Sequence, residues 1–150
     1  MILEIGSTDI SDIETFPLLW RWNQASHTIL PKEQIKRIEP FTVKKALELY
    51  GLVKQLEGKN IDSESMVIDT SGERKVIIEW LNKLNCKEEP VFISWNKDIA
   101  AKVPWHLFVD RWDDFCYPSS DDVDIVPMSG NWHLRYRHFE QFSWSKLNAI

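Results

Sequence analysis

Apolar positions in the middle of the chain recur at the spacing of amphipathic helices. In residues 42–58 they return every three or four residues, which predicts a helix with one buried face. That face consists of Val43, Ala46, Leu47, Tyr50, Val53 and Leu56. Thr42 suits the N-terminal cap of this helix, and Gly58 suits its end. A shorter helix is predicted over residues 31–39, because Pro31 suits the first helical position and Pro40 stops the helix.

Two further helices are predicted downstream. Thr70 and Glu73 match a capping box, and the helix that follows has its apolar positions at Val76, Ile77, Trp80, Leu81 and Leu84. Pro104 begins a helix over residues 104–115, whose apolar side holds Trp105, Phe108, Val109, Trp112, Phe115 and Cys116. Its opposite side carries Asp110, Asp113 and Asp114. The last two lie in the final turn, where the helix dipole disfavours negative charge.

Three segments have the pattern of strands. Residues 91–95 are almost continuously apolar, which predicts a central strand covered on both faces. Residues 123–128 read as a strand, and after a turn at 129–131 the alternating residues 132–144 read as a returning strand. Thirteen residues exceed a usual strand, so a bulge or bend is expected near 138–140. We also expect Asp122 or Asp124 to pair across the strands with Arg135 and Arg137.

These elements predict an α+β fold within a single domain, residues 1–150. We expect a small, mainly antiparallel sheet of about four strands packed against three or four helices. At 150 residues, 43% of them hydrophobic, the chain is long enough to bury a core, and most of its eight tryptophans are expected there.

Composition also excludes several classes of protein. The first residues have no basic region and no long apolar stretch, so we expect no secretory signal, and no segment approaches the roughly 20 apolar residues of a membrane span. Cys86 and Cys116 are too few for a disulfide scaffold or a zinc site, so buried thiols in the cytoplasm are expected. A pI near 5.4 without a basic run argues against direct binding of nucleic acid.

Negative charge is concentrated in one segment, residues 105–124. It holds six carboxylates and one base, a local charge of −5, which equals the net charge of the whole chain. The acids are Asp110, Asp113, Asp114, Asp121, Asp122 and Asp124, and aromatic residues are interleaved with them. Such a surface suits a basic partner. We expect Asp110, Asp113, Asp114, Asp121 and Asp122 to steer and bind that partner, with Trp112 and Tyr117 as anchors where they are exposed.

Catalytic, cofactor and metal motifs are not recognisable in the sequence. The histidines lack metal-binding spacing, DDVD lacks the glycine and glutamate of a calcium loop, and the five scattered glycines form no phosphate loop. We therefore expect no cofactor and no metal. The alternative left open is a small enzyme or ligand-binding protein with a tryptophan-lined pocket and a His/Asp acid–base pair. Its histidine would be His27, His106 or His138. A deep pocket with convergent histidine and carboxylate favours that alternative, and a flat acidic face favours an inhibitor.

Two segments, WNQASHTILPKEQIKRIEPFTVKKALELY and PVFISWNKDIAAKVPWHLFVDRWDDFCYPSSDDVDIVP, resemble a group of small uncharacterised bacterial cytosolic proteins. The matching positions are Trp22, His27, Pro31, Ile38, Pro40, Trp105, Trp112, Asp121 and Asp122. In size, acidity and tryptophan content the chain is similar to the immunity proteins of bacterial polymorphic and contact-dependent toxin systems. That resemblance implies a cytoplasmic inhibitor of one cognate toxin domain, a basic one such as a nuclease.

Overall fold

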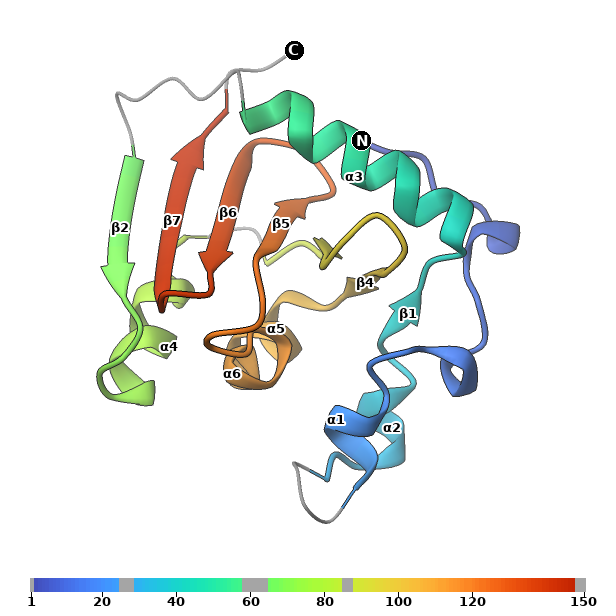
Figure 1. Ribbon diagram of the computed structural model, residues 1–150, viewed down its shortest axis with the longest axis horizontal. Coiled ribbons are helices and arrows are strands. Elements are labelled where there is room, and N and C mark those ends of the chain that lie inside the picture. Colours follow the sequence, from blue (N-terminus) through green and yellow to red (C-terminus); the bar gives the residue numbers. More distant parts are fainter. Residues whose placement is uncertain (1, 25–28, 58–64, 85–87, 148–150) are drawn as a thin grey trace.

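Seven antiparallel strands in one sheet form the framework of the described part of the chain (Figure 1). The computed structural model describes residues 2–24, 29–57, 65–84 and 88–147. The strands are β1 (Glu39–Pro40), β2 (Ser65–Asp69), β3 (Val91–Ser94), β4 (Ala100–Val103), β5 (Val123–Pro127), β6 (Trp132–Arg137) and β7 (Gln141–Lys146). Their order across the sheet is β1-β4-β3-β5-β6-β7-β2. The α+β class is as expected, but the sheet has more strands than the four predicted.

Helices cover both faces of this sheet. They are α1 (Trp20–Asn23), α2 (Lys32–Ile35), α3 (Val43–Glu57), α4 (Arg74–Asn82), α5 (Trp105–Asp110) and α6 (Trp112–Phe115), with 3-10 turns at Ser7–Asp9 and Ile13–Thr15. On β3, Phe92 packs with α3, whereas Val91 and Ile93 pack with α4, α5 and α6. Because neighbouring strand residues point to opposite faces, α3 lies on one face and α4–α6 on the other. All four residues of β3 are buried, as predicted for a central strand.

The extra strands come partly from the predicted returning strand, residues 132–144. The bend lies where it was expected, but it reverses the chain and divides the segment into β6 and β7. Glu140 has a left-handed backbone (φ 64°), and its N–H donates to the carbonyl of Arg137 at 2.9 Å. This is a tight turn rather than a bulge. Strands β1 and β4 are two and four residues long, too short to show a periodic pattern.

Helix α3 has nearly the predicted bounds, but its buried face is rotated. Thr42 accepts a hydrogen bond from the N–H of Lys45 at 3.2 Å, so the predicted cap forms. The buried apolar residues are Ala46, Leu49, Val53 and Leu56. Val43 and Leu47, predicted on this face, are exposed. Only the residues at i, i+3, i+7 and i+10 pack against the sheet. The prediction was wrong for Val43 and Leu47, which lie beside this row.

The predicted capping box at the start of α4 does not form. The N–H of Thr70 donates to the carbonyl of Glu140, which extends the pairing of β2 with β7 by one residue. Thr70 is thus drawn into the sheet and buried. The helix begins at Arg74, and the side chain of its N-cap residue, Glu73, makes no capping hydrogen bond.

The predicted helix over residues 104–115 is interrupted at Arg111. This residue has φ −125° and ψ 26°, which ends α5 and starts α6. The apolar side is buried as predicted, from Trp105 to Cys116. Because of the break, Asp113 and Asp114 lie in the single turn of the four-residue helix α6 and not in the last turn of a long helix. The predicted conflict with the helix dipole is therefore absent. None of the helices in the described residues has the length and apolarity to cross a membrane.

Candidate functional site

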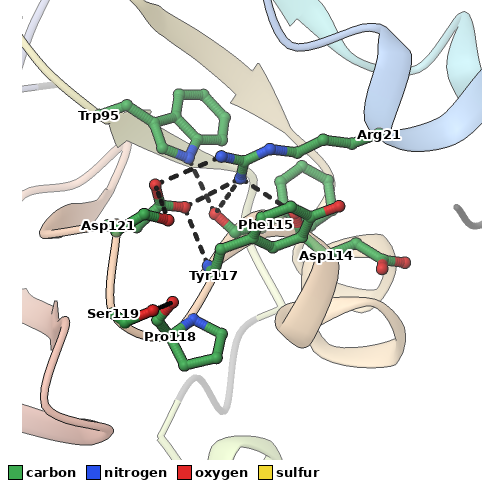
Figure 2. Close-up of polar contacts among 9 residues, drawn as sticks. Arg21, Trp95, Asp114, Phe115, Tyr117, Pro118, Ser119 and Asp121 are labelled. Atoms are coloured by element: carbon green, nitrogen blue, oxygen red, sulfur yellow. Dashed lines mark hydrogen bonds and ion pairs between the residues drawn. The ribbon is translucent and has the colours of Figure 1, made fainter.

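The acidic loop, residues 117–122, is fastened to the N-terminal part of the chain by Arg21 of α1 (Figure 2). Its Nη1 lies 2.9 Å from Oδ2 of Asp121, and its Nη2 lies 3.3 Å from Oδ1. Nη1 also donates to the carbonyl oxygens of Asp114 at 3.1 Å and Phe115 at 3.4 Å. One guanidinium therefore binds both the end of α6 and the loop that follows it. Charge-assisted, two-pronged contacts of this kind are strong and directional.

Aromatic side chains enclose this ion pair. The guanidinium carbon of Arg21 lies 3.9 Å from the ring centre of Tyr117 and 5.5 Å from that of Trp20. The indole N–H of Trp95 donates to the carbonyl of Phe115 at 2.8 Å. Only 5% of the Arg21 side chain and 12% of the Asp121 side chain are exposed. The pair is thus shielded from water, and the lower effective dielectric constant strengthens the attraction between the two charges.

The carboxylate of Asp121 is therefore already bound by other groups of the same chain. Besides Arg21, its carboxylate accepts a hydrogen bond from the N–H of Tyr117 at 2.9 Å. Tyr117 itself is half-buried against Arg21, and desolvation raises the pKa of its hydroxyl. Both residues were expected to contact a partner. Their contacts here shape and stiffen the acidic loop.

Arg74 of α4 connects two other predicted acids. Its Nε lies 3.1 Å from a carboxylate oxygen of Asp113, and about two-fifths of each side chain is exposed. Its Nη2 donates to the backbone carbonyl of Asp110, which leaves the exposed Asp110 carboxylate without an ion-pair partner among the described residues. Asp114 is half-buried, with its carbonyl bound to Arg21.

The remaining two acids pair with histidines, not with the arginines that were expected. Asp122 accepts hydrogen bonds from the N–H of His138 at 2.9 Å and lies 3.0 Å from its Nδ1. Desolvation raises the pKa of Asp122, but the bonds from His138 outweigh it, so the net shift is downward. Asp124 lies opposite Arg135 in the sheet, yet its carboxylate contacts the buried ring of His133 at 2.8 Å. Arg137 instead pairs with Glu57 of α3 at 3.4 Å.

The aromatic residue displayed on this part of the surface is Phe139, which the sequence analysis did not single out. Its side chain is 61% exposed at the tip of the β6–β7 turn and packs edge-on against His138. Trp112, the predicted anchor, is only 5% exposed and packs against Phe142, so the condition of exposure fails. The signal that could have found Phe139 was its position in the predicted bend at 138–140.

Five residues of the segments described above are connected by shared contacts, and we call them the acidic face: Asp110, Asp113, Asp122, Phe139 and Glu140. Asp110 and Asp113 are joined through Arg74, and Asp113 and Glu140 line the same recess of about 210 Å³. The N–H of Ser119 donates to the carbonyl of His138 at 2.8 Å, which ties the acidic loop to the β6–β7 turn. Ser119 and Glu140 both have left-handed backbones, a strained conformation for residues other than glycine.

A larger cavity of about 430 Å³ bears on the enzyme alternative. It lies between α2, α4 and α5, and both His106 and Asp110 line it, as do Arg74 and Arg111. Tryptophan is absent from its lining, and Nε2 of His106 lies 3.0 Å from a guanidinium nitrogen of Arg37. His138 lies outside this cavity, and His27 is outside the described residues. Within those residues, no three His, Cys, Asp or Glu side chains are arranged to hold a metal ion.

Tyr136, which lines the recess beneath the acidic face, should make the free energy of unfolding fall at alkaline pH. Burial raises the pKa of its hydroxyl from 10.0 to about 12. Between the unfolded pKa near 10 and the folded pKa, only the unfolded chain loses the tyrosine proton. Stability is therefore complete below pH 10 and falls as the pH rises towards 12, by at most about 1.4 kcal/mol per pH unit. Urea unfolding between pH 9 and 11.5 should show the decline. It should be shallower in Tyr136→Phe and unchanged in the control Tyr50→Phe.

Comparison with known proteins identifies no relative of this chain. No family model, no curated protein and no solved structure matches the chain.

Proposed function

We propose that this protein is an immunity-type inhibitor that binds a basic toxin domain through the acidic face. The observation that carries the proposal is Phe139, a 61% exposed ring that packs against His138, which in turn contacts the carboxylate of Asp122. Aromatic residues are enriched in the core of protein-binding interfaces, and polar residues form the rim around them. The structure supports Phe139, and not Trp112, as the aromatic anchor of such a site.

The anchoring of the acidic loop supports the same proposal. Arg21, Asp121 and the turn at Glu140 hold the acids in place before any partner arrives. A preformed surface loses little conformational entropy on binding, so more of the contact energy appears as affinity. The exposed carboxylates add long-range attraction for a positively charged surface, which raises the association rate at low salt.

The test is co-expression with the C-terminal domain of the protein encoded immediately upstream. We expect the two to co-purify as a 1:1 complex and the toxicity of the domain to be suppressed. Phe139→Ala should weaken binding at least about tenfold, as truncation of an anchor does. Asp122→Asn with Glu140→Gln should slow association, with an effect that shrinks as salt rises.

Matched controls exist on the far side of the molecule. Leu47→Ala removes an equally exposed apolar side chain from α3, and Glu4→Gln removes an exposed acid near the opposite end of β5. Neither should change affinity or rate by more than about twofold. Binding that is insensitive to salt, and equal in the face variants and the controls, would contradict the proposal.

Small-molecule binding is the second candidate, since His106 and Asp110 both line the 430 Å³ cavity. It is the weaker one for two reasons. The contact with Arg37 occupies one ring nitrogen of His106, and Arg74 is already bound to Asp113. The histidine of the acid–base pair would therefore have to break its contact with Arg37 before that nitrogen could act.

A further inference from the structure

The two edges of the sheet differ in how they are protected. The edge strand β1 has only two residues, one of them Pro40, and its Glu39 lies near Lys102 of β4 at 3.9 Å. Short length, proline and charge are the usual means of preventing edge-to-edge pairing. The other edge, β2, has five residues and presents Met66 and Val67 at 42% and 59% exposure. It carries none of these protections in its three central residues.

The pairing of β2 with β7 determines which backbone groups of β2 point outward. The N–H of Thr70 donates to Glu140, so Thr70 points towards β7. Hydrogen-bonded and non-hydrogen-bonded pairs alternate in an antiparallel ladder. Met66 and Ile68 therefore also point towards β7, whereas Ser65, Val67 and Asp69 direct their N–H and C=O groups away from the sheet.

We propose that β2 pairs with β2 of a second copy of this chain, antiparallel and centred on Val67, to form a symmetric dimer with one continuous sheet. In this register Val67 faces Val67 of the second copy, and Ser65 faces its Asp69. Every outward-pointing residue then meets another, so the two strands exchange six backbone hydrogen bonds. The segment is thus complementary to itself, as a twofold interface requires.

Side chains fit this register as well as the backbone does. Met66 lies opposite Ile68 of the second copy on the face that carries Phe142 and Trp144, so exposed apolar surface is buried there. Each Asp69 faces a serine and not the other Asp69, so like charges are not brought together. Its carboxylate is already satisfied within its own chain by the N–H and hydroxyl of Ser71 at 2.8 and 2.7 Å.

Five paired residues make a small interface. Complexes at the low end of interface size are transient, so we expect a dissociation constant of about 1–100 µM. Sedimentation equilibrium from about 1 µM to 1 mM should show a reversible monomer–dimer equilibrium. Hydrogen exchange should locate it: the amide of Val67 should gain protection as concentration rises, whereas those of Met66 and Ile68 should be protected throughout.

Two variants test the pairing without touching β7. Val67→Lys sets two ammonium groups opposite each other, and Val67→Pro removes the central outward N–H. Each should raise the dissociation constant at least about tenfold, with urea unfolding used to verify that the fold is retained. Val43→Lys, at an equally exposed valine on α3, is the control and should dimerise normally. A chain that stays monomeric at 1 mM, or a dimer unaffected by both Val67 variants, overturns the proposal. None of these substitutions lies on the acidic face, so this result is independent of toxin binding.

Discussion

Arg21→Met is expected to destabilise the protein by about 3–5 kcal/mol. The substitution removes one partner of a buried ion pair and leaves the carboxylate of Asp121, 12% exposed, without its counter-ion. It also deprives the carbonyls of Asp114 and Phe115 of a donor. Urea unfolding should show a lower midpoint at unchanged m-value, which would assign the loss to stability rather than to a change in compactness.

Two further variants separate charge from geometry at this site. Arg21→Lys keeps the charge but not the planar, two-pronged donor, so we expect an intermediate loss. Arg21→Met combined with Asp121→Asn removes the unpaired buried charge and should recover part of the stability lost in the single variant. A loss below about 1 kcal/mol in Arg21→Met would mean that the pair is effectively solvated, contrary to its burial.

Elements with a long periodic pattern or a continuously apolar run were predictable from the sequence. Helix α3, with fifteen residues, and the continuously apolar β3 were both expected at nearly their observed positions. Such segments signal their structure locally, through spacing and capping residues. What spacing alone could not determine was the exact stripe of α3 that the sheet accepts, because Val43 and Leu47 satisfy the helical period as well as Leu49 does.

The missed strands have a different physical origin. β1 and β4 are held by pairing with each other and with β3, and four residues or fewer cannot show a period. The division of residues 132–144 into β6 and β7 depends on the left-handed conformation of Glu140. No glycine or Asn-Gly pair announces this turn, so the sequence indicated a bend but not a reversal.

The acidic composition of the candidate site was predictable from the sequence, but the partner of each carboxylate was not. Six acids in one segment were visible, yet their fates depend on residues distant in sequence. Arg21 lies 100 positions from Asp121, and Arg74 lies 39 from Asp113. Contacts at such separation are set by the fold as a whole, so no local pattern reports which carboxylates remain exposed. The burial of Trp112 and the exposure of Phe139 follow from the same fold.

The buried pair of His133 and Asp124 should be the second most sensitive site. The ring of His133 is fully buried on β6, and the carboxylate of Asp124 on β5 lies 2.8 Å from its Nε2. His133→Leu leaves a buried carboxylate without this partner and should cost about 3–5 kcal/mol. Asp124→Leu should cost less, about 1–3 kcal/mol, because it leaves one ring nitrogen of His133 without a hydrogen-bond partner and leaves no carboxylate unpaired.

The variant that carries both leucines decides why these two substitutions are costly. If the cost is that of an unpaired buried polar group, removing both groups at once should restore most of the stability, since apolar residues of similar volume replace buried ion pairs with little loss. If the two side chains instead contribute to stability independently of each other, the two losses should add. We expect the first outcome, with a coupling energy of about 2 kcal/mol or more in a double-mutant cycle followed by urea unfolding. Ser145→Ala, a buried polar residue opposite His133 on β7, is the matched control and should cost less than about 1 kcal/mol.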